Sequence, residues 1–97
     1  MHRTRRGDTL WDLAEHYYGD GLLWPNIYRA TPAIGPNPDY LITGVDIAIP
    51  SLEGSPANLT AADASNLHQG YLVAYRAFQA RGDQRADTYL RMSEKYQ

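Results

Sequence analysis

Glycine and proline interrupt the first fifty residues of the chain so often that no helix or strand there can be long. Proline lacks the amide hydrogen that regular elements use, and glycine loses the most conformational freedom on folding. The interruptions fall at Gly7, Gly19, Gly21, Pro25, Pro32, Gly35, Pro36, Pro38, Gly44 and Pro50. Because short elements depend on packing against one another, this half of the chain predicts a small unit with a shared core.

The segment after Gly7 has the pattern of a short amphipathic helix. Asp8 or Thr9 can cap its first turn, and Asp12 adds an acidic side chain near the positive end of the helix dipole. Apolar side chains then recur with helical spacing, and the helix is expected to end at Gly19. The residues of this apolar stripe are Leu10, Leu13, Ala14 and Tyr17.

A second helix and two strands complete the first half. Pro25 favours a helix start at Trp24-Pro25, since the first helical position needs no amide hydrogen. Residues 45–49 alternate as a strand that Pro50 ends, and residues 2–6 are its expected partner. The order strand, helix, helix, strand predicts an α+β unit over residues 2–50, with two antiparallel strands covered on one face by two helices.

In the second half of the chain, the apolar residues recur with a different spacing. Residues 51–59 are expected to be a linker, and Thr60 with Asp63 has the spacing of a capping box. Helical spacing then continues to Gly82-Asp83 and resumes beyond it, so residues 60–97 predict an antiparallel helical hairpin whose first helix has about 20 residues. Its apolar stripe consists of Leu67, Tyr71, Ala74 and Phe78.

This apolar stripe must be covered. It can face the second helix of the hairpin alone, fold back on residues 2–50, or face another protein chain. We expect closure of the hairpin with some contact to the first unit, and next a homodimer or a protein partner bound through the C-terminal helices. The helices also resemble a tetratricopeptide unit, but one such unit cannot bury both of its faces.

Charge and composition exclude several classes of partner. Residues 1–50 carry four Arg and six acidic residues, and residues 51–97 carry five of each sign. Neither half has the basic excess that nucleic-acid binding requires. No apolar run reaches the ~20 residues of a membrane span, and there is no cysteine.

No signal peptide precedes the first strand, so we expect an excised fragment or a protein exported by another route.

Three blocks in the first half resemble one protein family. Residues 7–11 read Gly-Asp-Thr-Leu-Trp, residues 18–21 and 24–28 read Tyr-Gly-Asp-Gly and Trp-Pro-Asn-Ile-Tyr, and residues 37–41 read Asn-Pro-Asp-Tyr-Leu, followed by Gly44 and Ile49-Pro50. In this order and spacing, the blocks are similar to the LysM domain across residues 2–50. The resemblance implies a β-α-α-β fold and noncatalytic binding of glycans that contain N-acetylglucosamine, such as peptidoglycan or chitin.

The resemblance also places a ligand groove between two loops. Carried over position by position, the residues expected to bind the ligand are Gly7, Asp8, Thr9, Leu10, Pro38, Asp39, Tyr40, Leu41 and Ile42. Loops supply backbone groups for the acetamido group of the sugar, while Leu10, Tyr40 and Ile42 could supply apolar contact. Each hydrogen bond contributes only about 0.5–1.5 kcal/mol, so one copy is expected to bind weakly and to gain from multivalency.

Several of these residues also have simple structural interpretations. Asp8 can cap a helix and Asp39 can form a turn, and Trp24 at a helix start is typical of a core residue. Trp11 and Trp24 can also stack on sugar rings, and Tyr40 in a loop is a candidate contact. The three histidines share no ligand spacing, so no metal site is expected, and no cofactor or catalytic constellation is expected either.

Two functions remain open. The first is a cell-wall anchor in the bacterial envelope, in the periplasm or on the wall, that binds peptidoglycan. The second is a structural interaction module, of the kind found in phage tails and contractile-injection baseplates, in which the fold no longer binds sugar. The retained Gly-Asp-Thr-Leu and Asn-Pro-Asp loops favour the first function, which is the leading interpretation. The hairpin and residues 42–45, where Ile42-Thr43 and Val45 depart from the family pattern, slightly favour the second. A groove flanked by Thr9 and Tyr40 would support sugar binding, whereas a groove filled by the hairpin would support assembly.

Overall fold

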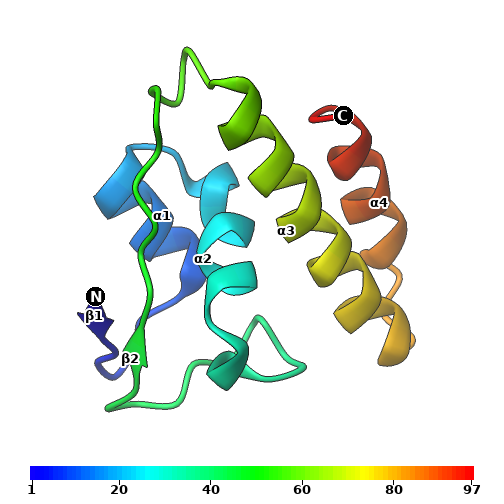
Figure 1. The fold of residues 1–97 in the computed structure, drawn as a ribbon. Helices are drawn as coiled ribbons and strands as arrows, with labels where there is room; N and C mark the ends of the chain where they lie inside the picture. Colours follow the sequence, from blue (N-terminus) through cyan, green and yellow to red (C-terminus); the bar gives the residue numbers. More distant parts are fainter.

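The computed structural model describes all residues from 1 to 97, and Figure 1 shows their arrangement. It is an α+β fold with a two-stranded antiparallel sheet and four α-helices. In chain order the elements are β1 (His2–Arg3), α1 (Leu10–Tyr18), the 3₁₀ turn η1 (Gly21–Leu23), α2 (Trp24–Ala30), the 3₁₀ turn η2 (Pro32–Ile34), β2 (Asp46–Ile47), α3 (Ala61–Ala80) and α4 (Ala86–Glu94).

The two strands are present but shorter than the predicted ranges 2–6 and 45–49. His2 pairs with Ile47 and Arg3 with Asp46. The amide of Thr4 still donates to the carbonyl of Val45, but the turn that begins at Arg5 then takes the chain away from the sheet. At the other end, the amide of Ala48 donates to the hydroxyl of Thr31 instead of a strand partner. Side-chain acceptors and turns therefore end the pairing early.

Thr4 joins the sheet to the loop before β2. Its hydroxyl donates to the carbonyl of Ile42 and accepts from the amide of Val45, and the residue is buried. A buried hydroxyl that has a partner both as a donor and as an acceptor stabilises the loop geometry. The threonine at this position therefore fixes the path of residues 42–45.

Helix α1 begins and ends as the sequence predicts. The Thr9 hydroxyl is the N-cap and accepts from the amide of Asp12 at 3.1 Å. Gly19 ends the helix in the left-handed conformation, and its amide bonds the carbonyl of Glu15. Leu10, Leu13 and Ala14 are buried, so the predicted apolar stripe faces the core over most of its length. Tyr17 is the exception, since 43% of its surface is exposed.

The helical hairpin is also present as predicted. Helix α3 has 20 residues, and Thr60 and Asp63 form a capping box at its start. The buried Asp63 carboxylate also accepts the amides of Glu53 and Gly54 at 2.8 Å each. These bonds hold the expected linker against the helix start, and they lower the pKa of Asp63 because the charged form is the better acceptor.

The apolar stripe of α3 is covered from two sides. Leu67, Tyr71, Ala74 and Phe78 are all buried. Figure 1 shows α3 running between α2 and α4, and one hydrophobic cluster contains residues from α1, α2, β2, α3 and α4. Hairpin closure and contact with the first unit thus both occur.

The contact between α2 and α3 is unusually close at one point. A Cβ atom added to Gly70 would lie 2.5 Å from the carbonyl oxygen of Pro25. The absence of a side chain at this position therefore lets the two helices approach backbone to backbone. The Tyr71 hydroxyl adds a hydrogen bond to the carbonyl of Leu22 across the same junction.

Candidate functional site

A groove of about 180 Å³ lies where the start of α1 meets the loop after η2 and the helical hairpin. Thr9, Leu10 and Trp11 come from the start of α1, and Pro38 and Asp39 come from the loop. Trp24 of α2 and Tyr89 of α4 complete the lining. The structure thus brings together residues from both of the loops that the family resemblance implies as a binding site.

Hydrogen bonds to the Asp8 side chain hold the first of these loops, residues 7–10. The Asp8 carboxylate accepts the amide of Arg5 at 2.8 Å and bonds the His2 ring at 2.9 Å. The bond to His2 contributes most to the lowered pKa of Asp8. Because the Asp8 carboxylate is hydrogen-bonded to the Arg5 amide and the His2 ring, Asp8 shapes the turn that precedes Thr9.

The second loop is a turn that is bonded to the hairpin. The side-chain oxygen of Asn37 accepts the amide of Asp39 at 3.0 Å and also accepts from the Arg81 guanidinium at 3.0 Å. The Asp39 carboxylate pairs with Arg85 at 2.5 Å. Pro38, between them, is buried and lines the groove. Residues 37–39 are therefore fixed by the chain's own C-terminal half.

The aromatic rings of the lining are placed by close packing. Trp11 lies directly over Gly21, where an added Cβ would come within 2.2 Å of the indole. Trp24 is buried, as the sequence predicts, and meets the Tyr89 ring edge to face at 5.5 Å between centroids. Trp11 remains 47% exposed. The groove therefore combines a buried aromatic floor with accessible aromatic side chains.

The structure places four of the nine predicted ligand-binding residues in the groove lining and five outside it. Thr9, Leu10, Pro38 and Asp39 line the groove. The other five do not: Gly7 and Asp8 form the turn before Thr9, Tyr40 and Ile42 are 65% and 56% exposed, and Leu41 joins Ile42 at a very small separate hollow beside β2. For these five, contact with a ligand stays a prediction.

Sequence reasoning did not place Tyr89 in the site. The sequence places it only in the helical pattern after Gly82-Asp83, because its position in the groove depends on how α4 packs. For Trp11 the sequence offers ring stacking, and for Trp24 it offers either ring stacking or a place in the core. Burial raises the pKa of Tyr89, so its hydroxyl stays protonated at neutral pH and can both donate and accept.

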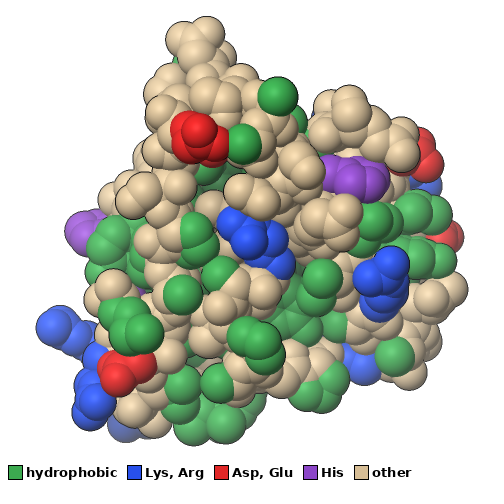
Figure 2. Space-filling view, in the orientation of Figure 1, with side chains coloured by type: hydrophobic (Ala, Val, Ile, Leu, Met, Phe, Trp, Pro, Cys, Tyr) green, Lys and Arg blue, Asp and Glu red, His purple; other side chains and the backbone are tan.

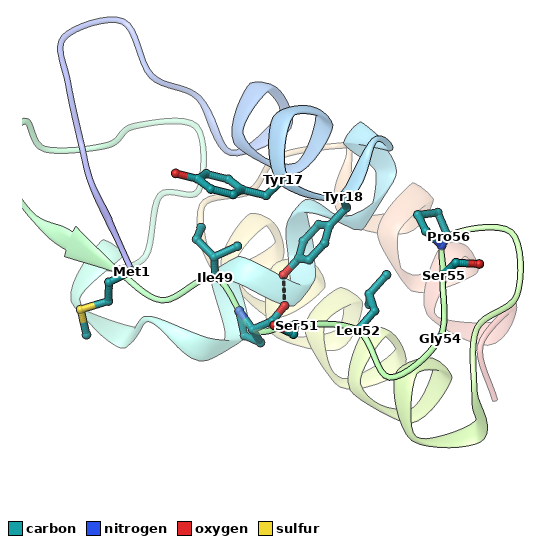
Figure 3. Close-up of a pocket in the computed structure, with 10 residues that line it drawn as sticks. Met1, Tyr17, Tyr18, Ile49, Ser51, Leu52, Gly54, Ser55 and Pro56 are labelled. Carbon is teal, nitrogen blue, oxygen red and sulfur yellow. Dashed lines mark hydrogen bonds between the residues drawn. The ribbon is translucent and has the colours of Figure 1, made fainter.

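A larger hollow of about 440 Å³ lies at the other end of α1. Figure 3 shows Tyr17 and Tyr18 facing Ile49 and Leu52 across it. The Tyr18 hydroxyl donates to the carbonyl of Pro50, which fixes the segment after β2. None of the nine predicted residues lines this hollow, so the smaller groove is the better candidate site.

On the face drawn in Figure 2, the positive charges do not gather into one large basic patch. Figure 2 shows Lys and Arg side chains mostly scattered among apolar and uncharged surface, with a small group at the edge near β1. Arg3, Arg5 and Arg6 are exposed there, and Arg3 pairs with Asp46 at 3.1 Å. No three His, Asp or Glu side chains are grouped to hold a metal ion.

Comparison with known proteins gives no family assignment. A scan against family models, a search of curated proteins and a search of solved structures each found no match. None of the helices has the combination of length and apolar character needed to cross a bilayer. The arrangement itself offers aromatic faces, aliphatic contacts and a few polar groups, which is the usual lining of a site for a small, partly apolar ligand.

Proposed function

We propose that this chain is a noncatalytic carbohydrate-binding module of the LysM type that recognises N-acetylglucosamine-containing glycan, and bacterial peptidoglycan in particular. The observation that carries the proposal is the groove between the Gly-Asp-Thr-Leu loop and the Asn-Pro-Asp loop, where Thr9 and Leu10 meet Pro38 and Asp39. In the bacterial envelope, such a module would anchor its protein to the cell wall.

The chemistry of the lining supports this ligand. A pyranose ring has apolar faces that pack on aromatic side chains, and Trp11 and Tyr89 are both accessible in the groove. The Thr9 hydroxyl and the Asp39 carboxylate supply polar groups at its edges. A few such contacts at about 0.5–1.5 kcal/mol each give roughly 4 kcal/mol at most, which corresponds to a dissociation constant of about 1 mM. Tight attachment would then need several copies.

The first experiment is co-sedimentation with purified, insoluble peptidoglycan. Wild type is compared with Trp11→Ala, and Leu22→Ala serves as the control because it removes a similarly exposed large apolar side chain that does not line the groove. We expect wild type and Leu22→Ala to sediment and Trp11→Ala to remain in solution while still folded. Wild type that stays in the supernatant at every concentration would contradict the proposal.

Tyr40→Ala belongs in the same experiment. Its ring is 65% exposed and outside the groove lining, although the family resemblance implies a contact. Loss of sedimentation by a folded Tyr40→Ala protein would extend the site from the groove to its outer edge. Unchanged sedimentation would confine the site to the groove residues.

The second candidate is a structural interaction module that no longer binds sugar. The observation that favours it is the docking of the hairpin beside the groove: Arg85 pairs with Asp39, and Tyr89 contributes to the lining. These contacts take part of the space between the loops, but a groove of about 180 Å³ remains. If sedimentation fails, size-exclusion chromatography with light scattering tests whether the chain associates through its C-terminal helices.

A further inference from the structure

The side chain of Tyr89 lies where it would touch a ligand bound in the groove. It lines the groove, yet it comes from the C-terminal hairpin rather than from either predicted binding loop. Its ring stacks on the buried Phe78 at 4.9 Å between centroids and meets Trp24 edge to face. Two fixed rings therefore hold the Tyr89 ring, so it would lose little conformational freedom when a ligand binds.

The hairpin is also bonded to the second loop of the groove. Arg85 precedes Tyr89 by about one helical turn and pairs with Asp39, while Asp83 holds the same guanidinium at 2.7 Å. The Arg85 guanidinium also lies over the Phe78 ring, 4.5 Å from its centroid. Phe78 thus supports both the ion pair at the loop and the aromatic side chain in the groove. The position of Tyr89 relative to Asp39 is accordingly built into the fold.

We propose that Tyr89 contacts the bound glycan, so that the C-terminal hairpin is a specificity-determining part of the binding site. This inference rests on the glycan-binding function proposed above. The groove of about 180 Å³ is smaller than the roughly 300–1,000 Å³ of pockets for drug-sized ligands, so it accommodates one sugar ring of a longer chain. Tyr89 presents to that ring the part of its half-buried side chain that lines the groove, and its hydroxyl offers one hydrogen-bonding group.

The test uses substitutions that keep the hairpin folded. Tyr89→Leu removes the aromatic ring but keeps apolar bulk against Phe78, and Tyr89→Phe removes only the hydroxyl. Tyr75→Leu is the matched control, because Tyr75 is a partly buried tyrosine packed against the same core but does not line the groove. Binding of N-acetylglucosamine oligomers is measured by isothermal titration calorimetry, and folding is checked by circular dichroism and Tm.

We expect Tyr89→Leu to weaken binding of the oligomers by about fivefold or more, while Tyr75→Leu binds as wild type does. Wild-type affinity in Tyr89→Phe would assign the contact to the ring face, and reduced affinity would assign part of it to the hydroxyl. Unchanged affinity in Tyr89→Leu, with binding lost in Trp11→Ala, would overturn the role of the hairpin alone. If wild type binds no oligomer and no peptidoglycan, the proposed function fails together with this inference.

Discussion

The Arg85 guanidinium and the Asp39 carboxylate form an ion pair between residues 46 positions apart in the sequence. The pair joins the turn between α3 and α4 to the loop that lines the groove. Arg81 and Asn37 make a second bond between the same two segments. The predicted binding half and the helical half are therefore connected at the candidate site itself, as well as through the core that they share.

The energetic contribution of this ion pair can be measured with a double-mutant cycle. Both side chains are about half exposed, so we expect the coupling between Arg85→Ala and Asp39→Ala to be only about 0.3–1 kcal/mol in urea unfolding. Arg85→Ala alone should cost more than Asp39→Ala, because it also removes packing on Phe78. Arg91→Ala, an exposed arginine on α4, is the control. Equal losses from the two single variants would contradict this account.

Gly70→Ala tests the close approach of α2 and α3. Alanine is normally the better helix former by about 1 kcal/mol, but here its Cβ would lie 2.5 Å from the Pro25 carbonyl oxygen. Since a backbone atom cannot move aside cheaply, we expect a net loss of about 1–3 kcal/mol in stability. Gln69→Ala, at the exposed neighbouring position, should leave stability unchanged or raise it. A stabilised Gly70→Ala protein would show that the helices are free to separate.

Gly21→Ala tests how Trp11 is positioned. The added Cβ would lie 2.2 Å from the indole, so the partly exposed ring must move away from its place in the groove. We expect sedimentation with peptidoglycan to fall as in Trp11→Ala, with a change in tryptophan emission and little change in Tm. In a Trp11→Ala background, Gly21→Ala should weaken binding no further. An additional loss there would mean that Gly21 acts through another group.

Asp63→Asn tests the attachment of residues 53–60 to α3. The carboxylate accepts the amides of Glu53, Gly54 and Thr60, and an amide side chain has one acceptor oxygen in place of two. We expect Tm to fall by roughly 5–10 °C. Asp87→Asn, an exposed aspartate in the first turn of α4, makes the same chemical change without these partners and should have little effect. Similar losses in both variants would exclude the specific role of Asp63.

Acid pH should destabilise the protein through three aspartates. Arg85 lowers the pKa of Asp83 to about 2, and hydrogen bonds also lower the pKa of Asp8 and Asp63. Unfolded aspartate titrates near 3.9, so below about pH 4 the unfolded chain binds more protons than the folded protein. The stability from these groups is therefore present above about pH 4 and is lost as pH falls toward 2.

Urea unfolding between pH 7 and pH 2.5 measures this dependence. In Asp83→Asn, the decline at low pH should be shallower than in wild type, because one of the three groups no longer titrates. Asp87→Asn provides the comparison here too. A free energy of unfolding that stays constant down to pH 2.5 would be inconsistent with these lowered pKa values.

Local features of the fold were predictable from the sequence because the interactions that create them span few residues. Thr9 caps α1, Gly19 ends it, and Thr60 with Asp63 starts α3, all through hydrogen bonds within four residues. Helical spacing likewise identified the buried stripe of α3. The strand ends were less predictable, since they depend on the Thr31 hydroxyl and on a turn at Arg5 that compete for backbone groups.

The candidate site was predictable only in part. The sequence by itself supplied the blocks whose family resemblance implies two binding loops, and Thr9, Leu10, Pro38 and Asp39 from those loops do line one groove. Only the tertiary structure decided that Tyr89 joins them, that Arg85 holds Asp39, and that Tyr40 and Ile42 remain outside. The first two outcomes depend on how α3 packs against α2 and how α4 packs against α3. Many side chains from distant segments set that docking together, and no local pattern encodes it.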